Sequence, residues 1–259
     1  VFQEVALQGL PLRLCLDRAG LVGGDGAVHH GFCDISILRI FPNAALLAAM
    51  DEPSLVAGLE FMREYDDGLS AIRYPRDAVS EVANLKSQIA NYKSEDVCPP
   101  FVLGKARTLI EHHQPDAAIL AYGVMAIEAL KALDHLNGGR EYKVNVYDAR
   151  FAKPVDRELI RSLLSRNIPV ITVEDHSLTG GFGSCVIENA LEMGVGARVI
   201  TRKGLPETWI YQDERLAQLA EAGIDATHIA RTVREVLDRV PAATGRAASE
   251  VEVVTRQQT

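Results

Sequence analysis

The sequence lacks any apolar run long enough to cross a membrane, and it has no stretch typical of a secretory signal. A spanning helix needs roughly 20 consecutive apolar residues, so neither membrane insertion nor export is expected. Basic charge is also scarce, because 27 Lys and Arg face 35 Asp and Glu and the net charge is -8. This balance disfavours broad binding to nucleic acid or anionic lipid. We therefore expect a cytoplasmic protein in which any phosphate is bound by a local basic pocket.

Cysteine is sparse, and no two cysteines form a CxxC pair. The four cysteines are Cys15, Cys33, Cys98 and Cys185. Their scatter predicts reduced thiols rather than disulfides. His112 and His113 have no acidic or cysteine partner at a ligand spacing, and neighbours on a helix point about 100° apart. The sequence therefore predicts no metal site.

The chain also lacks a starting methionine, since it begins at Val1. After the expected end of a helix over 2–7, it enters an apolar run over 10–16 that is typical of a buried strand. A domain whose first strand is already buried is expected to miss its opening. Missing strands would leave an apolar edge, which we expect a dimer partner, a further segment or a rearranged sheet to cover.

What the chain does contain is an ordinary globular composition, with 47% apolar and 24% charged residues. Its 259 residues suffice for one large or two small domains. A β-α-β-α-β pattern over 1–78 predicts a parallel sheet. The less patterned stretch over 79–114 predicts a linker with some local structure. A second α/β domain is expected over 115–240, and small polar residues over 241–259 predict a disordered tail.

Turn residues and helix caps place the individual elements. Strands are expected over 11–17, 44–50, 69–74, 117–122, 142–147, 168–173 and 198–201. Helices are expected over 34–40, 125–136, 157–166, 213–222 and 226–239, with two more between Asp51 and Gly68 and between Ser184 and Gly194. The expected N-cap residues are Asp34, Asp51, Asp156 and Asp225.

The stretch over 17–31 follows the first strand and carries the densest chemistry. It holds five glycines within twelve residues, beside Asp25, His29 and His30. Open α/β sheets place ligands at the carboxyl ends of their strands, and glycines let the backbone approach a ligand closely. A polar surface connection without function is an equal alternative at this point.

Within this loop, His29 and His30 are the candidate acid–base groups, because imidazole titrates near neutral pH. Asp25 is expected to face one of them. Arg18 and Arg73 both end predicted strands of one sheet, so two guanidiniums could clamp one phosphate. The alternatives are loop histidines satisfied by the backbone and arginines in structural salt bridges.

Three other features remain open. Arg76 is a weaker alternative to Arg73. The run Glu174-Asp175-His176 is similar to a catalytic cluster, but its residues could equally be capping or interface groups. The helix start over 179–184 favours close helix–strand packing over an anion site. Trp209 is expected in a core or an interface.

Gly24-Asp25-Gly26 is typical of the metal motif of thiamine-diphosphate enzymes. That motif also needs an asparagine at a fixed distance downstream. The corresponding window over 51–54 has none, and Asn43 comes too early. We therefore predict that Asp25 is not a metal ligand.

Taken together, the loop motifs resemble the 1-deoxy-D-xylulose-5-phosphate synthase family, thiamine-diphosphate enzymes related to transketolase. The specific part is Asp17-Arg18-Ala19-Gly20, followed by Gly24-Asp25-Gly26, His29 and Gly31. Further matches follow in order over 72–76, 120–123, 148–154, 173–175, 180–184 and 204–206. The resemblance covers roughly residues 1–240.

The resemblance implies a partial pyrimidine-binding-type parallel-sheet domain, followed by a transketolase C-terminal-type α/β domain. It also implies a homodimer that condenses pyruvate with glyceraldehyde 3-phosphate and releases CO₂, using thiamine diphosphate and Mg²⁺. The product feeds isoprenoid, thiamine and pyridoxal synthesis. On this basis Arg18 and Arg73 would bind the acceptor phosphate, and Asp25 and His29 would lie near the reacting carbons.

The departure from the family is large, because its diphosphate and Mg²⁺ domain and its catalytic glutamate are not found in the sequence. We therefore expect this chain alone neither to bind thiamine diphosphate tightly nor to turn over. Three hypotheses follow. The chain is the C-terminal part of a synthase, the C-terminal subunit of a split enzyme, or a non-catalytic dimerisation module.

Overall fold

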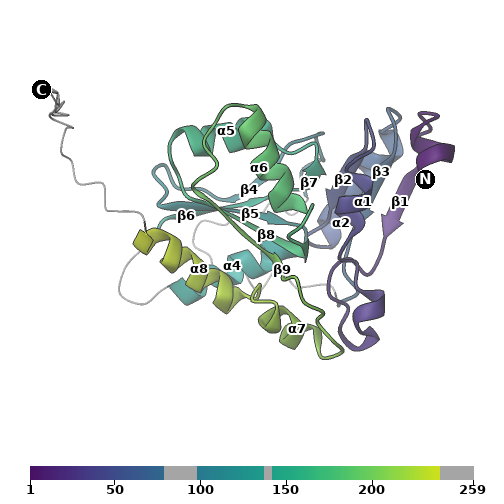
Figure 1. Ribbon diagram of the computed structural model, residues 1–259. Coiled ribbons are helices and arrows are strands. Elements are labelled where there is room, and N and C mark those ends of the chain that lie inside the picture. The colour runs from purple at the N-terminus through teal and green to yellow at the C-terminus, as the bar shows by residue number, and fades with distance from the viewer. Residues whose placement is uncertain (79–97, 137–141, 240–259) are drawn as a thin grey trace, which may run out of the picture.

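Two β-sheets organise the chain, one built mainly from its first third and the other from the remainder (Figure 1). The computed structural model describes residues 1–78, 98–136 and 142–239. Most of the predicted linker and the predicted tail lie outside these ranges. Within them, no helix has the length and apolar character needed to cross a bilayer.

The first sheet has the spatial order β1-β3-β2-β7. Its strands are β1 (Arg13–Leu16), β2 (Ala45–Ala48), β3 (Ser70–Arg73) and β7 (Phe151–Lys153). Strands β1 and β2 both run parallel to β3, which confirms the predicted parallel sheet. Strand β7 pairs antiparallel with β2 and comes from the second half of the chain. The sequence analysis missed this strand, because only three residues take part.

The helices of this first part follow their capping residues. The first turn is η1 (Phe2–Ala6), and α2 (Glu52–Glu64) begins at a capping box between Asp51 and Ser54. Helix α1 (Asp34–Leu38) has Cys33 at its N-cap instead of the predicted Asp34, and it ends two residues earlier than predicted. Asp34 does not cap the helix, because its carboxylate is bound by Arg73 Nε at 2.9 Å.

The second sheet has the order β4-β6-β5-β8-β9. Its strands are β4 (Arg107–Ile110), β5 (Ala117–Tyr122), β6 (Val144–Asp148), β8 (Val170–Ser177) and β9 (Ile200–Leu205). Strands β5, β6, β8 and β9 are parallel, whereas β4 pairs antiparallel with β6. Strand β4 lies within the stretch predicted as a linker, so part of that stretch belongs to the second sheet.

Helices cover both faces of the second sheet (Figure 1). One face carries α4 (Met125–Leu136) and α8 (Ala226–Arg239), and the other carries α5 (Arg157–Ser165) and α6 (Phe182–Glu192). Helix α7 (Arg215–Glu221) lies beside the loop that follows β1. Asp156 and Asp225 cap α5 and α8, as predicted, by accepting N–H bonds at 3.0 and 3.1 Å.

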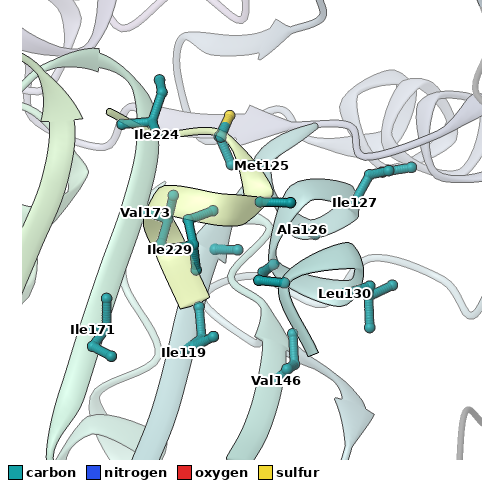
Figure 2. Packing of buried hydrophobic residues seen from close by; sticks show 14 of the residues in the cluster. Ile119, Met125, Ala126, Ile127, Leu130, Val146, Ile171, Val173, Ile224 and Ile229 are labelled. Carbon is teal, nitrogen blue, oxygen red and sulfur yellow. The ribbon is translucent and has the colours of Figure 1, made fainter. Parts of the chain in front are cut away.

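Alternating residues of β5 enter two different cores. Ile119 packs toward α4 and α8 beside Leu130 and Ile229 (Figure 2). Leu120 faces the other way, into a core that also contains Leu46 of the first sheet. This second core is common to both sheets, so burial of apolar surface fixes them against each other. The loop after β1 is thereby held beside the second sheet.

Candidate functional site

The loop over 17–31 closes on itself at its two ends. Gly31 N donates to Arg18 O at 3.1 Å and to Gly20 O at 2.9 Å, and Gly20 N donates back to Gly31 O at 3.0 Å. A Cβ on Gly31 would lie 2.6 Å from Arg18 O, so only glycine fits this closure. Inside the closure are two short 3₁₀ turns, η2 (Gly23–Asp25) and η3 (Ala27–His29), separated by Gly26 with φ 78°.

Two arginines meet one carboxylate oxygen at the open side of this loop. Arg18 Nη1 forms an ion pair with Asp25 Oδ2, and Arg76 Nε lies 3.1 Å from the same oxygen. The side chains of Arg18 and Arg76 are 41% and 54% exposed. Asp17, which is largely exposed, lies 3.8 Å from Arg18 Nε. The Arg18–Asp25–Arg76 cluster therefore presents two accessible guanidiniums that an anion can reach.

Arg73, the predicted second arginine of the clamp, lies elsewhere. Its side chain is buried, and Nε donates to Asp34 Oδ2. Its Nη2 donates to Gly31 O at 2.7 Å and to Asp175 O at 3.2 Å. This arrangement matches the structural salt bridge that the sequence analysis kept as the alternative. The weaker candidate, Arg76, occupies the place expected of Arg73.

The signal that separates the two arginines was present in the sequence. Arg73 is the last residue of β3, and all four residues of this strand are buried. Pro75 cannot donate to a sheet, so Arg76 falls in the loop beyond the strand. Burial opposes ionisation of Asp34, but the Arg73 guanidinium holds the pKa of that carboxyl below its usual range.

The two loop histidines differ in their contacts. His29 is exposed, and its Nδ1 lies 3.1 Å from Asp25 O. The contact of His29 is thus with the backbone of Asp25, while the Asp25 carboxylate faces the arginines. His30 accepts from Val22 N at Nδ1 and donates from Nε2 to Ile210 O at 3.0 Å. Both nitrogens of His30 are occupied, so it holds structure while His29 remains accessible.

The run Glu174-Asp175-His176 supports the loop and the helices around it. Glu174 is fully buried and accepts the N–H groups of Phe182 and Gly183 at the start of α6. The two oxygens of Glu174 therefore already accept the N–H groups of Phe182 and Gly183, which are not free to bind an external anion. Burial raises the pKa of Glu174 to about 8.

His176 is also fully buried. Its Nε2 accepts from Ile35 N at 3.2 Å, and its Nδ1 donates to Ser177 O at 2.8 Å. Burial lowers the pKa of His176 to about 3, so this imidazole is neutral at ordinary pH. Asp175 accepts from Leu21 N at 3.0 Å and from Arg215 Nη2 at 2.6 Å. All three residues act as capping and loop-holding groups.

A cavity of about 290 Å³ lies between the loop and the segment after β9. Leu21, His30 and Phe32 line one side, and Trp209 lines the other. Trp209 is 63% exposed and packs edge-on against Phe32, with 5.5 Å between ring centroids. It is therefore a surface residue and not part of the core.

The described residues do not fit a magnesium–diphosphate site. Across these ranges no group of three or more His, Cys, Asp or Glu side chains could hold a metal ion. His112 and His113 line an open polar groove near Arg166. Oδ2 of Asp25 is bound by Arg18 and Arg76, so this oxygen is paired with cationic side chains of the protein.

Two residues that hold the loop were missed by sequence reasoning. Gln218 exchanges hydrogen bonds with Gly23, and Arg215 donates to Leu21 O at 3.0 Å. Both lie on α7, almost 200 positions downstream of the loop, and neither belongs to a motif. Nothing local in the sequence could have shown that they contact it.

Comparison with known proteins assigns both halves of the chain to known domain families. Residues 1–81 match the pyrimidine-binding domain of transketolase, and residues 104–229 match the transketolase C-terminal domain. A 1-deoxy-D-xylulose-5-phosphate synthase of Rhodopirellula baltica is 35% identical over 95% of this chain. The corresponding enzyme of Acaryochloris marina is 38% identical over 93%. The chain spans 36% of the length of each of these relatives.

Solved structures show the same fold. A split-gene transketolase, described as an inactive β4 tetramer, is 26% identical with a TM-score of 0.72, over 91% of this chain and 69% of that one. A transketolase from Pichia stipitis has a TM-score of 0.64 at 16% identity, over 90% of this chain and 31% of that one. The chain therefore belongs to the transketolase family, as a pyrimidine-binding domain followed by a C-terminal domain, and its curated relatives are 1-deoxy-D-xylulose-5-phosphate synthases.

Proposed function

We propose that this chain provides the acceptor-binding part of a thiamine-diphosphate-dependent transferase. The reaction is the condensation of pyruvate with glyceraldehyde 3-phosphate, with loss of CO₂. The observation that carries the proposal is the meeting of Arg18 and Arg76 on Asp25, beside the exposed His29. The identity of 35–38% to 1-deoxy-D-xylulose-5-phosphate synthases supports this substrate pair.

The arginines would bind the acceptor through its phosphate. A guanidinium presents a planar set of N–H donors that fits phosphate oxygens in pairs. Asp25 holds Arg18 and Arg76 side by side, so less side-chain entropy is lost when the phosphate arrives. Arg73 has no part in this contact, because its donors are engaged with Asp34 and the loop backbone.

His29 would supply a proton to the acceptor. When a carbon–carbon bond forms at the aldehyde, charge develops on its oxygen, and that oxygen must take up a proton. The carbonyl of Asp25 can only accept a hydrogen bond, so His29 Nδ1 carries its hydrogen. Nε2 is then the nitrogen left to donate to the substrate oxygen when the imidazole is protonated.

The cofactor would be bound by polypeptide that this chain does not contribute. The curated relatives are almost three times as long as the matched segment. We propose that the chain alone releases no CO₂ when mixed with thiamine diphosphate, Mg²⁺ and both substrates. Turnover by the purified chain would contradict this expectation, and activity restored by a diphosphate-domain polypeptide would support it.

A separate-subunit role is the second candidate, favoured by the split-gene transketolase whose solved chain covers 91% of this one. In that case a second chain would carry the diphosphate domain, and affinity purification should recover it. For either candidate we also propose a homodimer in the cytoplasm. Light scattering that shows a monomer at micromolar concentration would contradict the dimer.

Phosphate binding tests the proposal most directly. Calorimetric titration of the chain with glyceraldehyde 3-phosphate should give saturable binding that weakens as salt is added. Arg18→Met and Arg76→Met should each weaken it by about tenfold or more, because charge-assisted pairs contribute about 1.5–3 kcal/mol. Lys105→Met is the matched control, since Lys105 lies at the start of the second domain and pairs with Glu158. Equal affinity in all four proteins would overturn the proposal.

A further inference from the structure

Side chains bind much of the backbone of three buried loop residues, Leu21, Val22 and Gly23, the last of which begins η2. Leu21 and Val22 are 0% and 1% exposed, and Gly23 is also buried. Buried N–H and C=O groups need partners, because each unpaired group carries its full desolvation penalty. Val22 N donates to His30 Nδ1 at 3.3 Å. The side chains that bind the backbone of Leu21 and Gly23 come from the second domain.

Gln218 supplies two of those partners. It is 0% exposed, and its Oε1 accepts from Gly23 N at 2.8 Å. Its Nε2 donates to Gly23 O at 3.2 Å and to Tyr211 O at 2.7 Å. One amide side chain thus satisfies both backbone groups of Gly23 and fixes the plane of that peptide segment.

Asp175 and Arg215 hold Leu21, two residues before Gly23, in the same way. Leu21 N donates to Asp175 Oδ1, and Leu21 O accepts from Arg215 Nε. Arg215 Nη2 also donates to Asp175 Oδ2, so the two side chains form one unit. Gly20, with φ 73°, passes directly against the Asp175 carboxylate, where a Cβ would lie 2.0 Å from Cγ.

A continuous set of backbone hydrogen bonds connects Gly23 to the site. Gly26 N donates to Gly23 O at 3.1 Å, and His29 N donates to Gly26 O at 3.1 Å. These bonds close the two 3₁₀ turns that carry Asp25 and His29. A shift of Gly23 therefore moves both turns.

We propose that Gln218 is a positioning residue, which sets Asp25 and His29 for the acceptor through the backbone of Gly23. The inference rests on the proposed function, because Gln218 can affect acceptor binding only if the acceptor binds at Arg18, Asp25 and His29. It also gives the C-terminal domain a part in acceptor binding, although that domain contributes no side chain to the Arg18–Asp25–Arg76 cluster.

The variant that isolates this role is Gln218→Met. Methionine has nearly the same length and volume as glutamine, so packing is retained while all three hydrogen bonds are lost. Gln218→Glu keeps the acceptor for Gly23 N but loses both donors, and it should give an intermediate effect. Glu128→Ala is the matched control. Glu128 is 8% exposed and is hydrogen-bonded to Ala226 N and Lys131, neither of which belongs to the loop.

Two measurements are made on each protein. Amide hydrogen exchange over residues 19–31 reports the order of the loop. Titration with glyceraldehyde 3-phosphate reports the affinity of the chain for this ligand. In Gln218→Met we expect exchange in the loop to be at least about tenfold faster and the affinity to be about tenfold weaker. In Glu128→Ala we expect a loss of overall stability in urea, with exchange in the loop rising no more than elsewhere and an unchanged affinity.

Each outcome decides the inference. Unchanged loop exchange in Gln218→Met would overturn it. Faster exchange with wild-type affinity would also overturn it, since Gln218 would then be merely structural, while the proposed function would stand. If the wild-type chain binds no glyceraldehyde 3-phosphate, the proposed function is overturned, and the positioning role is overturned with it.

Discussion

Arg73 and Arg76 are three residues apart, yet the structure places them in opposite surroundings. The Arg73 side chain is 6% exposed and bound to Asp34, whereas the Arg76 side chain is 54% exposed and lies against Asp25. The difference arises at Pro75, where the strand has ended and the chain turns toward solvent. Arg73 therefore binds the buried backbone of the loop at Gly31, whereas Arg76 contacts Asp25 at the solvent-exposed surface of the loop.

The comparison teaches that residue type and sequence proximity do not assign a role by themselves. A buried ion pair is expensive to break, because the remaining charge has no water to solvate it. An exposed pair contributes little to stability and leaves its charge available to a ligand. The same guanidinium chemistry thus serves structure at Arg73 and, in the function that we propose, phosphate binding at Arg76.

The largest expected effect comes from Arg73→Met. Removal of the guanidinium leaves the Asp34 carboxylate without its 2.9 Å partner and Gly31 O without its donor. We expect the free energy of unfolding to fall by about 3–5 kcal/mol, measured by urea denaturation. Arg76→Met is the contrasting variant and should change stability by no more than about 0.5 kcal/mol. Equal losses in the two variants would break the comparison.

A smaller effect is expected from glycine substitutions in the loop. In Gly31→Ala the new Cβ would lie 2.6 Å from Arg18 O and 2.9 Å from Ala19 Cα, and both are backbone atoms that cannot turn aside. We expect a loss of about 1–3 kcal/mol in thermal or urea denaturation. Gly24→Ala serves as the control, because nothing lies within 4 Å of its Cβ position, and its stability should stay near that of the wild type.

The third prediction concerns how the free energy of unfolding changes with pH, and it depends on His176. Its folded pKa is lowered to about 3 by burial, below the usual value near 6.5. Between these values the unfolded chain binds the extra proton, so the free energy of unfolding rises with pH across this window. The contribution of His176 is full above about pH 6.5 and decreases by up to about 1.4 kcal/mol per pH unit as the pH falls.

His176→Gln should flatten that acid slope, which denaturation midpoints from pH 4 to pH 7 would show. The exposed His29→Gln variant is its control and should follow the wild-type profile. A wild-type slope retained in His176→Gln would show that other groups cause the acid sensitivity, and the contrast between buried and exposed histidines would then fail.

The sequence predicted the helices and strands well, because capping residues and apolar periodicity act between residues that are close in the chain. The capping box at Asp51 fixes the start of α2, and the strand over 117–122 and the helix over 125–136 have the bounds that the apolar pattern predicts. The chemistry-bearing loop was also identified, since its glycines and ionisable residues are contiguous. Its residues' roles in binding remain predictions.

What sequence reasoning missed depends on contacts between distant segments. Strand β4 was taken as part of a linker, because four residues paired with β6 give too short a pattern to recognise. The contact of Gln218 with Gly23 spans 195 positions and leaves no trace in spacing. The ion pair of Arg73 with Asp34 and the contact of Arg76 with Asp25 also join residues that lie far apart in the sequence, so spacing alone does not separate the two arginines.

Strand β7 has a consequence for how the gene can be divided. Its three residues pair with β2, Ala48 N donates to Arg150 O at 2.9 Å, and Lys153 Nζ reaches the carbonyls of Arg39 and Phe41. A cut within the predicted linker would leave the N-terminal fragment without its fourth strand and the C-terminal fragment with an unpaired one. The two fragments should therefore reassociate when co-expressed. A chimaera joined at this linker would combine β2 of one protein with β7 of another, so we expect it to fold only when these two strands come from the same protein.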